Sequence, residues 1–346
     1  MSHHEKYMQR CIELAKNGLG TTYPNPLVGS VIVYNDEIIG EGWHQKAGEA
    51  HAEVNAVNSV KDPTLLSQST IYVSLEPCSH YGKTPPCSDL IIEKNIPNIV
   101  IGTIDPFAKV SGNGIQKLKE AGRNVTVGVL EKECAELNQR FFTFHTKKRP
   151  YIILKWAESA DGFIAPKHKE INEPVWISNT YSRQLVHKWR SEEQAILVGT
   201  QTVLDDNPKL DVRDWKGQNP IRIALDKTGK ITEDFHIYTT DSKTIIITEE
   251  KKQSIDQRIF ENAIFDNRLI FQIVAILHRQ NIQSVIIEGG KRTLETFIEA
   301  DLWDEARIFK SKIILNEGIS APKIELKKVQ KKTVLDDELL ILKNHD

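Results

Sequence analysis

Short apolar segments alternate with helical patterns along the whole chain, and this alternation constrains the fold more than any other feature. In the first half we expect strands at 28–33, 37–43, 71–75, 99–102 and 125–128, and helices at 5–18, 51–60, 88–94, 112–120 and 131–142. Helices of this length between strands usually cover the faces of a sheet and connect parallel neighbours. The pattern therefore predicts a covered, partly parallel α/β sheet.

The pattern restarts after the basic segment 146–150, which ends at a proline. Here we expect strands at 151–156, 195–198, 221–225, 244–248, 284–288, 305–314 and 338–342, and helices at 183–191, 270–280 and 292–299. A length of 346 residues also suits two domains better than one. We predict two α/β domains, at 1–146 and 150–346.

Charge and cysteine content narrow the class of protein. The 45 Lys and Arg residues nearly balance 47 Asp and Glu residues, so no global basic field attracts a nucleic acid. Four cysteines are too few for a disulfide scaffold. No apolar run approaches the roughly 18 residues that cross a bilayer, and the start of the chain does not resemble a signal peptide. These features predict a cytoplasmic protein that acts on neither nucleic acid nor membrane.

The strongest chemical signal is a set of metal-ligating residues in the first half. His51, Cys78 and Cys87 supply three ligands, the number typical of a catalytic zinc site that keeps its fourth position for water. Glu53 lies two residues after His51, close enough to reach a zinc-bound water without being a ligand. Zinc nucleobase deaminases combine these groups, because the metal activates water and a carboxyl group relays its proton to the leaving amine.

Other interpretations of these residues remain open from the sequence. A structural zinc site would need a fourth ligand, for which His44 or His80 is available. A nucleic-acid adenosine or cytidine deaminase with an accessory domain would share the ligands, although its two cysteines usually lie closer together. A zinc-stabilised scaffold without catalysis is a third alternative, but it has no use for Glu53.

Two segments resemble one known family closely. Residues 75–87 read LEPCSHYGKTPPC and residues 23–29 read YPNPLVG, and both are similar to the bifunctional riboflavin-biosynthesis deaminase/reductases. The resemblance implies a cytidine-deaminase-like α/β/α domain that uses zinc to deaminate a diaminopyrimidinone bearing a ribosylamino 5-phosphate. It assigns zinc to His51, Cys78 and Cys87 and the general acid/base role to Glu53.

The resemblance also implies contacts to the deaminase substrate. It assigns them to Asn25, His80, Lys83 and Asp105. A rigid turn without a ligand contact is the alternative interpretation of the loop around Asn25, and a solvated lysine is the alternative for Lys83. Phe107 stands where the family usually has Asn, so the contact of that side chain does not carry over.

The second half resembles the reductase of the same family, whose fold is like dihydrofolate reductase. The matching segments are 155–162, 176–178, 197–208 and 287–290, so the resemblance covers essentially the whole chain. It implies NADPH-dependent reduction of the ribosyl group to ribityl, and homo-oligomeric assembly. The cofactor contacts that it implies are Ala157, Trp176, Thr202, Asp206, Gly290, Lys291, Arg292, Thr293, Leu294, Glu295 and Thr296. The implied substrate contacts are Lys155, Arg190, Leu210, Arg213 and Glu288.

Physical features of the second half agree with this assignment. Gly289 and Gly290 separate an apolar strand from a helix, where backbone N–H groups can bind a pyrophosphate, although a plain tight turn has the same signature. No well-placed GxGxxG motif indicates a Rossmann site. The guanidinium groups of Arg190 and Arg213 match phosphate oxygens, unless these are ordinary surface arginines. Pro174 departs from the polar residue that the family commonly has there.

Overall fold

The computed structural model describes residues 2–81, 85–107, 112–167, 175–239, 242–325 and 328–344. Its chain forms two compact units, Met1–Lys148 and Arg149–Asp346. The expectations for Lys83 and Pro174 fall outside the described residues. Within the described ranges, every helix is too short or too polar to cross a membrane.

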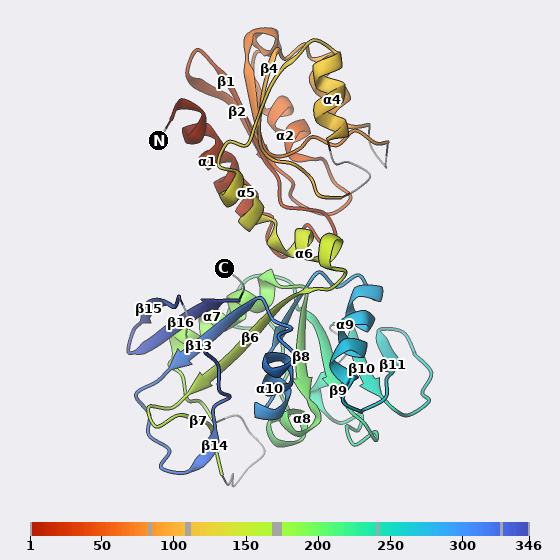
Figure 1. Ribbon diagram of the computed structural model, residues 1–346, viewed down its shortest axis with the longest axis vertical. Helices are drawn as coiled ribbons and strands as arrows, with labels where there is room; N and C mark the ends of the chain where they lie inside the picture. The colour runs from red at the N-terminus through yellow and green to blue at the C-terminus, as the bar shows by residue number, and fades with distance from the viewer. Residues whose placement is uncertain are drawn as a thin grey trace. The chain divides into compact units, whose positions relative to one another are not determined.

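The first unit is built on a five-stranded sheet in the order β2-β1-β3-β4-β5 (Figure 1). The strand β1 pairs antiparallel with β2 and β3, and β3, β4 and β5 run parallel. Its elements are α1 (His3–Lys16), β1 (Gly29–Tyr34), β2 (Glu37–Trp43), α2 (Ala52–Ser59), η1 (Pro63–Gln68), β3 (Thr70–Leu75), α3 (Cys87–Glu93), β4 (Asn98–Thr103), α4 (Asn113–Glu120), β5 (Asn124–Val127), α5 (Glu131–Leu137) and α6 (Gln139–Lys147).

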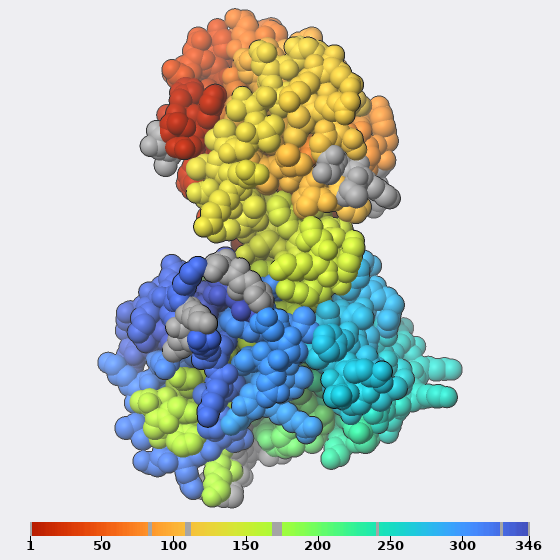
Figure 2. Space-filling view, in the orientation of Figure 1, coloured from red at the N-terminus to blue at the C-terminus, as the bar shows by residue number. Residues whose placement is uncertain are grey.

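Helices cover both faces of this sheet. The buried residues of α1 and α5 form one apolar cluster with β1, β3 and β4, and those of α2, α3 and α4 form another on the opposite face. Helices α1, in dark red, and α4, in yellow, contribute to the outer surface of the unit (Figure 2). The helix α1 begins at a capping box, in which Ser2 and Glu5 satisfy each other's backbone N–H groups. The layers position α2 and α3 on the same face.

The second unit contains a nine-stranded sheet in the order β11-β10-β9-β8-β12-β6-β13-β16-β15. Strand pairs from β11 through β13 are parallel, and β16 and β15 add an antiparallel edge. The elements are β6 (Tyr151–Glu158), β7 (Phe163–Pro166), α7 (Thr180–Glu192), β8 (Ala195–Gly199), α8 (Thr200–Asp206), β9 (Ile221–Leu225), η2 (His236–Tyr238), β10 (Thr244–Thr248), β11 (Arg258–Asn262), α9 (Leu269–Arg279), β12 (Ser284–Ile287), α10 (Lys291–Glu299), β13 (Glu305–Lys310), β14 (Gly318–Ser320), β15 (Gln330–Val334) and β16 (Asp337–Lys343).

The two faces of the large sheet are also covered by helices. Buried residues of α9 and α10 pack on one face, and those of α7 and α8 on the other. The central strands β8, β12 and β6 are therefore apolar on both sides, as expected for parallel strands. Their carboxyl ends lie side by side, which is where parallel α/β sheets bind ligands.

A buried ion pair anchors the start of the second unit. The Arg149 guanidinium donates to both carboxylate oxygens of Asp304, at 2.5 and 2.7 Å, and the Ile152 backbone N–H donates to the same carboxylate at 2.9 Å. Only 10% of the Arg149 side chain and 8% of the Asp304 side chain are exposed. The fork geometry satisfies both charges away from water.

We expect Arg149→Ala to destabilise the second unit by about 3–5 kcal/mol, because it leaves a buried carboxylate without its cation. Denaturant unfolding followed by tryptophan fluorescence measures this loss. The control is Arg268→Ala, which removes an arginine whose side chain is 73% exposed in its ion pair with Asp266. That change should cost less than about 1 kcal/mol. Equal losses for both variants would contradict the structural role of the buried pair.

Candidate active sites

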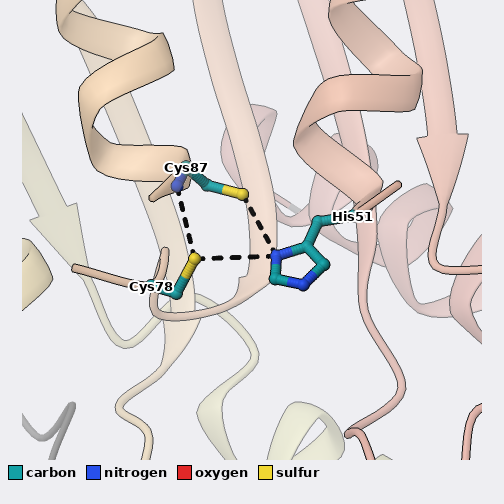
Figure 3. A group of neighbouring side chains, drawn as sticks. All are labelled: His51, Cys78 and Cys87. Carbon is teal, nitrogen blue, oxygen red and sulfur yellow. Dashed lines mark hydrogen bonds between the residues drawn. The ribbon is translucent and has the colours of Figure 1, made fainter. Parts of the chain in front are cut away.

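Three metal-ligating side chains meet in the first unit. His51 precedes α2, Cys87 begins α3, and Cys78 lies in the loop after β3. His51 Nδ1 lies 3.6 Å from Cys78 Sγ and 3.3 Å from Cys87 Sγ. Figure 3 shows the three side chains pointing toward one another from two helix starts and a loop. The structure thus brings together the three residues predicted to hold zinc.

The donor set fits a zinc ion. Tetrahedral zinc places a nitrogen and a sulfur ligand about 3.6 Å apart, given its usual bond lengths. Hydrogen bonds from Cys87 and His51 outweigh burial and lower the pKa of Cys78 to about 4. The charged Cys78 and burial together raise the pKa of Cys87, so a second thiolate needs a cation beside it. Within the described ranges, no fourth His, Cys, Asp or Glu donor joins this group.

Glu53 lies beside the metal ligands on the first turn of α2. Its side chain is buried and interacts with Cys87. Burial raises the pKa of Glu53 to about 7, and the negative charge of Cys78 adds to this effect. A carboxyl group with this pKa can accept and release a proton near neutral pH.

A buried histidine connects Asn25 to this region. His44 Nδ1 lies 3.1 Å from the Ala50 carbonyl oxygen, which can only accept, so Nδ1 donates. His44 Nε2, 3.0 Å from Asn25 Nδ2, is then the acceptor of the Asn25 amide proton. The His44 ring also packs edge-on against the His51 ring. His44 is therefore engaged elsewhere rather than available as a fourth zinc ligand, and it orients Asn25.

Glu76 holds the loop that carries Cys78. Its carboxylate accepts the backbone N–H groups of Gly112 at 3.0 Å and Gly114 at 2.9 Å, which ties the loop to the start of α4. A Cβ atom at Gly114 would lie only 2.1 Å from the Pro77 carbonyl oxygen, so the close approach requires glycine. This positioning role of Glu76 follows only from the tertiary contacts.

The other residues predicted to bind the deaminase substrate differ in exposure. Asp105 is buried, accepts the Phe107 backbone N–H at 2.8 Å, and has a pKa raised to about 6 by burial. The Phe107 ring lies 4.7 Å from the His145 ring, so it makes an aromatic contact instead of the amide contact usual in the family. His80 is exposed.

In the second unit, three half-buried charged side chains meet where the central strands end. Arg190 Nη2 on α7 donates to Glu288 Oε2, just after β12, at 2.8 Å. Lys155 on β6 faces both groups, and burial lowers its pKa although Glu288 opposes the shift. Burial alone would raise the pKa of Glu288, but Arg190 and Lys155 outweigh it and lower the pKa to about 2. Glu288 is therefore a half-buried carboxylate at neutral pH.

One oxygen of this carboxylate has no partner among the described residues. Glu288 Oε1 is buried without a hydrogen bond, as is the Nε of Arg190. A buried carboxylate oxygen without a donor is costly, which indicates a ligand group that donates to it. This oxygen is free to accept a hydrogen bond, as a predicted substrate contact at Glu288 would require.

Several of the residues predicted to bind NADPH lie at or beside the first turn of α10. The Gly290 backbone N–H donates to Thr202 Oγ1 on α8 at 2.9 Å. Cβ atoms at Gly199 and Gly289 would lie 2.7 and 2.8 Å from the Thr293 side chain. Glycine at both positions therefore allows the ends of β8 and β12 to approach α10 closely. Lys291 donates to Ser320 Oγ at 2.6 Å and pairs with Glu295.

The remaining predicted contacts occupy varied positions. The Trp176 side chain is 48% exposed and stacks with the guanidinium of Arg183 at 4.4 Å. The side chains of Leu210 and Leu294 are packed in the apolar clusters. A ligand would therefore contact these two residues through their backbone atoms. Ala157, Asp206, Arg292 and Thr296 lie on β6, α8 and α10, around the same strand ends.

Known proteins match both halves of the chain. The model of the "Cytidine and deoxycytidylate deaminase zinc-binding region" matches residues 1–103, and that of the "RibD C-terminal domain" matches 150–334. The riboflavin biosynthesis protein RibD of Aquifex aeolicus is 38% identical over 97% of each chain. The homologue from Actinobacillus pleuropneumoniae is 42% identical over 82% of this chain and 77% of its own.

Solved structures agree over the full length. The deaminase/reductase of Thermotoga maritima is 36% identical, covers 99% of this chain and 98% of its own, and has a TM-score of 0.89. RibD of Acinetobacter baumannii is 31% identical over the same shares, with a TM-score of 0.86. These matches confirm the predicted α/β fold classes and the predicted cofactors, zinc and NADPH. The chain therefore belongs to the RibD family of riboflavin biosynthesis proteins, and it is an enzyme that joins a zinc-binding deaminase domain to a reductase domain.

Proposed function

We propose that this chain catalyses two consecutive reactions of riboflavin biosynthesis. The first is zinc-dependent hydrolytic deamination of 2,5-diamino-6-(5-phosphoribosylamino)pyrimidin-4-one, and the second is NADPH-dependent reduction of its ribosyl group to ribityl. The observation that carries the proposal is the His51, Cys78 and Cys87 group with the buried Glu53 beside it. We assign deamination to residues 1–146 and reduction to 150–346.

In the deaminase, His51, Cys78 and Cys87 would hold zinc. Bound zinc would supply a Lewis acid that makes water nucleophilic at neutral pH. Glu53 accepts a proton from the attacking water and delivers it to the leaving amine nitrogen, so that water is consumed and ammonia released. Its pKa near 7 suits both transfers.

The pyrimidine would be bound by the side chains that surround this centre. Asn25, oriented by His44, supplies amide hydrogen bonds to the base. The buried Asp105 contributes a carboxyl group, and the exposed His80 lies at the periphery, whereas the contact by Lys83 stays a prediction from the sequence. Among the described residues, the predicted contacts thus comprise buried groups for the base and the exposed His80 for the phosphorylated sugar.

In the reductase, bound NADPH would supply the hydride. Lys155 and Glu288 would flank the ribose at its C1′ atom, the atom to be reduced, and Arg190 keeps Glu288 charged and in place. Arg213, with 41% of its side chain exposed, is accessible for the substrate phosphate. The backbone at Gly290 would contact the cofactor, and the backbone at Leu210 would contact the substrate.

The cofactor would lie along the first turn of α10. The residues that we assign to it are Ala157, Trp176, Thr202, Asp206, Gly290, Lys291, Arg292, Thr293, Leu294, Glu295 and Thr296. Thr202 and Gly290 are already bonded to each other, which joins α8 to this turn. Phosphorylated pyrimidines are the substrates of this proposal; homo-oligomeric assembly, a cytoplasmic location, and the lack of nucleic-acid and membrane partners stay predictions.

The two activities can be tested separately on the full chain. Purified enzyme should release ammonia from the diaminopyrimidinone phosphate without NADPH, and should oxidise NADPH only after deamination. We expect Glu288→Gln to keep ammonia release while reduction of the deaminated pyrimidine falls at least ~10-fold, because the orphaned charged acceptor is lost. Both activities are followed in the same preparation.

Glu299→Gln provides the matched control. Glu299 is an exposed residue at the end of α10, so the same change of charge there should leave both activities intact. A Glu288→Gln enzyme that is folded and zinc-loaded but has lost ammonia release would contradict independent sites. Undiminished reduction would remove Glu288 from the substrate site.

A further inference from the structure

One face of α7 carries three basic side chains toward the reductase site. Arg183, His187 and Arg190 are spaced at i, i+4 and i+7, so they lie on the same side of the helix. Arg183 stacks on Trp176, and Arg190 pairs with Glu288. His187 has neither of these contacts and no role in the reactions derived above.

His187 is bonded to the segment 211–214. The ring is buried, and its Nδ1 lies 2.9 Å from the backbone carbonyl oxygen of Asp211. Arg190 Nη1 donates to the same carbonyl at 3.3 Å. The Asp211 side chain in turn accepts from Arg213 Nη1 at 2.5 Å. A continuous set of hydrogen bonds thus runs from α7 through Asp211 to Arg213.

We propose that His187 is a positioning residue for the phosphate of the reductase substrate: it fastens the segment 211–214 to α7 and thereby sets the place of the Arg213 guanidinium. This inference rests on the proposed function, which assigns the phosphate to Arg213. Arg213 lies on an irregular segment between α8 and β9, so it lacks the support of a helix or strand. A long side chain on such a segment anchors a phosphate well only if its backbone is fixed.

The protonation of His187 is coupled to the same charges. A carbonyl only accepts, so Nδ1 carries a proton, and Nε2 can donate to Asp214 Oδ2, 3.3 Å away, only in the imidazolium form. Burial and the positive charges of Arg190 and Arg213 lower the pKa of His187. The carboxylate of Asp214 and the hydrogen bond to the Asp211 carbonyl raise it. Glu288 is a further charged group that interacts with the ring.

A phosphate dianion bound to Arg213 would offset these neighbouring cations. The pKa of His187 then rises on binding, and the enzyme takes up a proton with the phosphate. The extra affinity is fully present below the pKa of the free enzyme and is lost as pH rises through the pKa of the complex. His187 therefore contributes a hydrogen bond to Asp211 at every pH and a second one to Asp214 only at lower pH.

Three enzymes test this role: the wild type, His187→Leu, which removes both bonds, and His187→Asn, whose amide replaces only the Nδ1 donor. Steady-state reduction is measured with the deaminated pyrimidine phosphate and with its dephosphorylated form. For the phosphorylated substrate we expect His187→Leu to raise KM about 10-fold with kcat within about twofold. The KM for NADPH, the rate of ammonia release and the kinetics with the dephosphorylated substrate should not change.

The pH profile separates the two bonds. The KM of His187→Asn should match the wild type near pH 8.5 and exceed it increasingly as pH falls toward 6. The substrate phosphate also titrates near pH 6, but it affects both enzymes alike and cancels in the KM ratio.

Val186→Ala is the control for a merely structural effect. Val186 is buried on the same helix, in the core cluster, so its truncation should weaken α7 while the bonds of His187 and Arg190 to the Asp211 carbonyl stay available. The positioning role is overturned if Val186→Ala reproduces the rise in KM. It is also overturned if the His187 variants raise KM equally for the phosphorylated and the dephosphorylated substrate. A wild-type enzyme indifferent to the phosphate overturns the assignment of Arg213 as well, and with it that part of the proposed function.

Discussion

Replacing Glu53 by Gln is expected to lower deaminase turnover by at least ~10²-fold while the zinc content stays at one ion per chain. The substitution keeps the shape and the hydrogen-bonding capacity of the side chain but removes its ability to carry a proton. Glu53 is buried, and burial raises its pKa to about 7, so the neutral amide should be tolerated at this position. Ammonia release and metal analysis on the same sample measure both quantities.

Glu49→Gln is the matched control for this experiment. Glu49 lies four residues earlier and is exposed, so it tests the same substitution outside the site. That variant should deaminate like the wild type. The Glu53→Gln enzyme should also still oxidise NADPH with the deaminated pyrimidine. If Glu53→Gln retained near-normal ammonia release, the carboxyl group would have a structural role only.

Replacing Cys78 or Cys87 by Ser should abolish zinc binding and deamination together. Each side chain supplies one of three donors, and a serine hydroxyl does not replace a thiolate as a zinc ligand at neutral pH. Zinc content should fall from one ion per chain to nearly none, and ammonia release should become undetectable. Reduction of the deaminated pyrimidine should continue, because the reductase residues lie in the other unit.

Cys11→Ser distinguishes loss of a ligand from loss of a buried thiol. Cys11 is fully buried outside the metal group, and its thiol donates to the Tyr72 carbonyl oxygen, a bond that a hydroxyl can also make. This variant should keep its zinc. Full deamination by wild-type protein after exhaustive chelation would disprove the zinc requirement, whatever the cysteine variants do.

The two experiments together separate metal binding from proton transfer. Cys78→Ser removes the ion and the reaction, whereas Glu53→Gln removes only the reaction. A structural zinc site predicts a different result, because loss of zinc would then unfold the first unit and Glu53→Gln would have no effect on turnover. Far-ultraviolet circular dichroism of both variants shows which description holds.

The positions of the strongly apolar strands and helices were predictable from the sequence, because the side chains of each element drive its own burial. The buried strands 221–225 and 244–248 occur at the predicted bounds, and most predicted helices begin and end within three residues of their predicted bounds. The edge strands β11 and β15 were not predicted. The lysine-rich β15 is exposed and exists because it pairs with β16 at the sheet edge, and β11 depends in the same way on β10.

The expected helix at 131–142 is instead two helices, α5 and α6, separated at Asn138. The Asn138 side chain accepts the Leu27 backbone N–H at 2.8 Å and donates to the Leu27 carbonyl oxygen at 2.9 Å. These two bonds connect Asn138 to Leu27, which lies far away in the sequence. Periodicity along 131–142 contains no information about Leu27, so only the fold reveals the break.

The catalytic chemistry shows the same division. The sequence by itself predicted His51, Cys78 and Cys87 as metal ligands with Glu53 beside them, because the types and spacing of these residues are specific to the chemistry proposed for them. The structure brings the three ligands together. Only the tertiary structure decided that His44 orients Asn25, that Arg190 holds Glu288 and that His187 is bonded to Asp211. Such contacts join side chains from separate elements, and their short distances depend on how the strands and helices pack rather than on any local pattern.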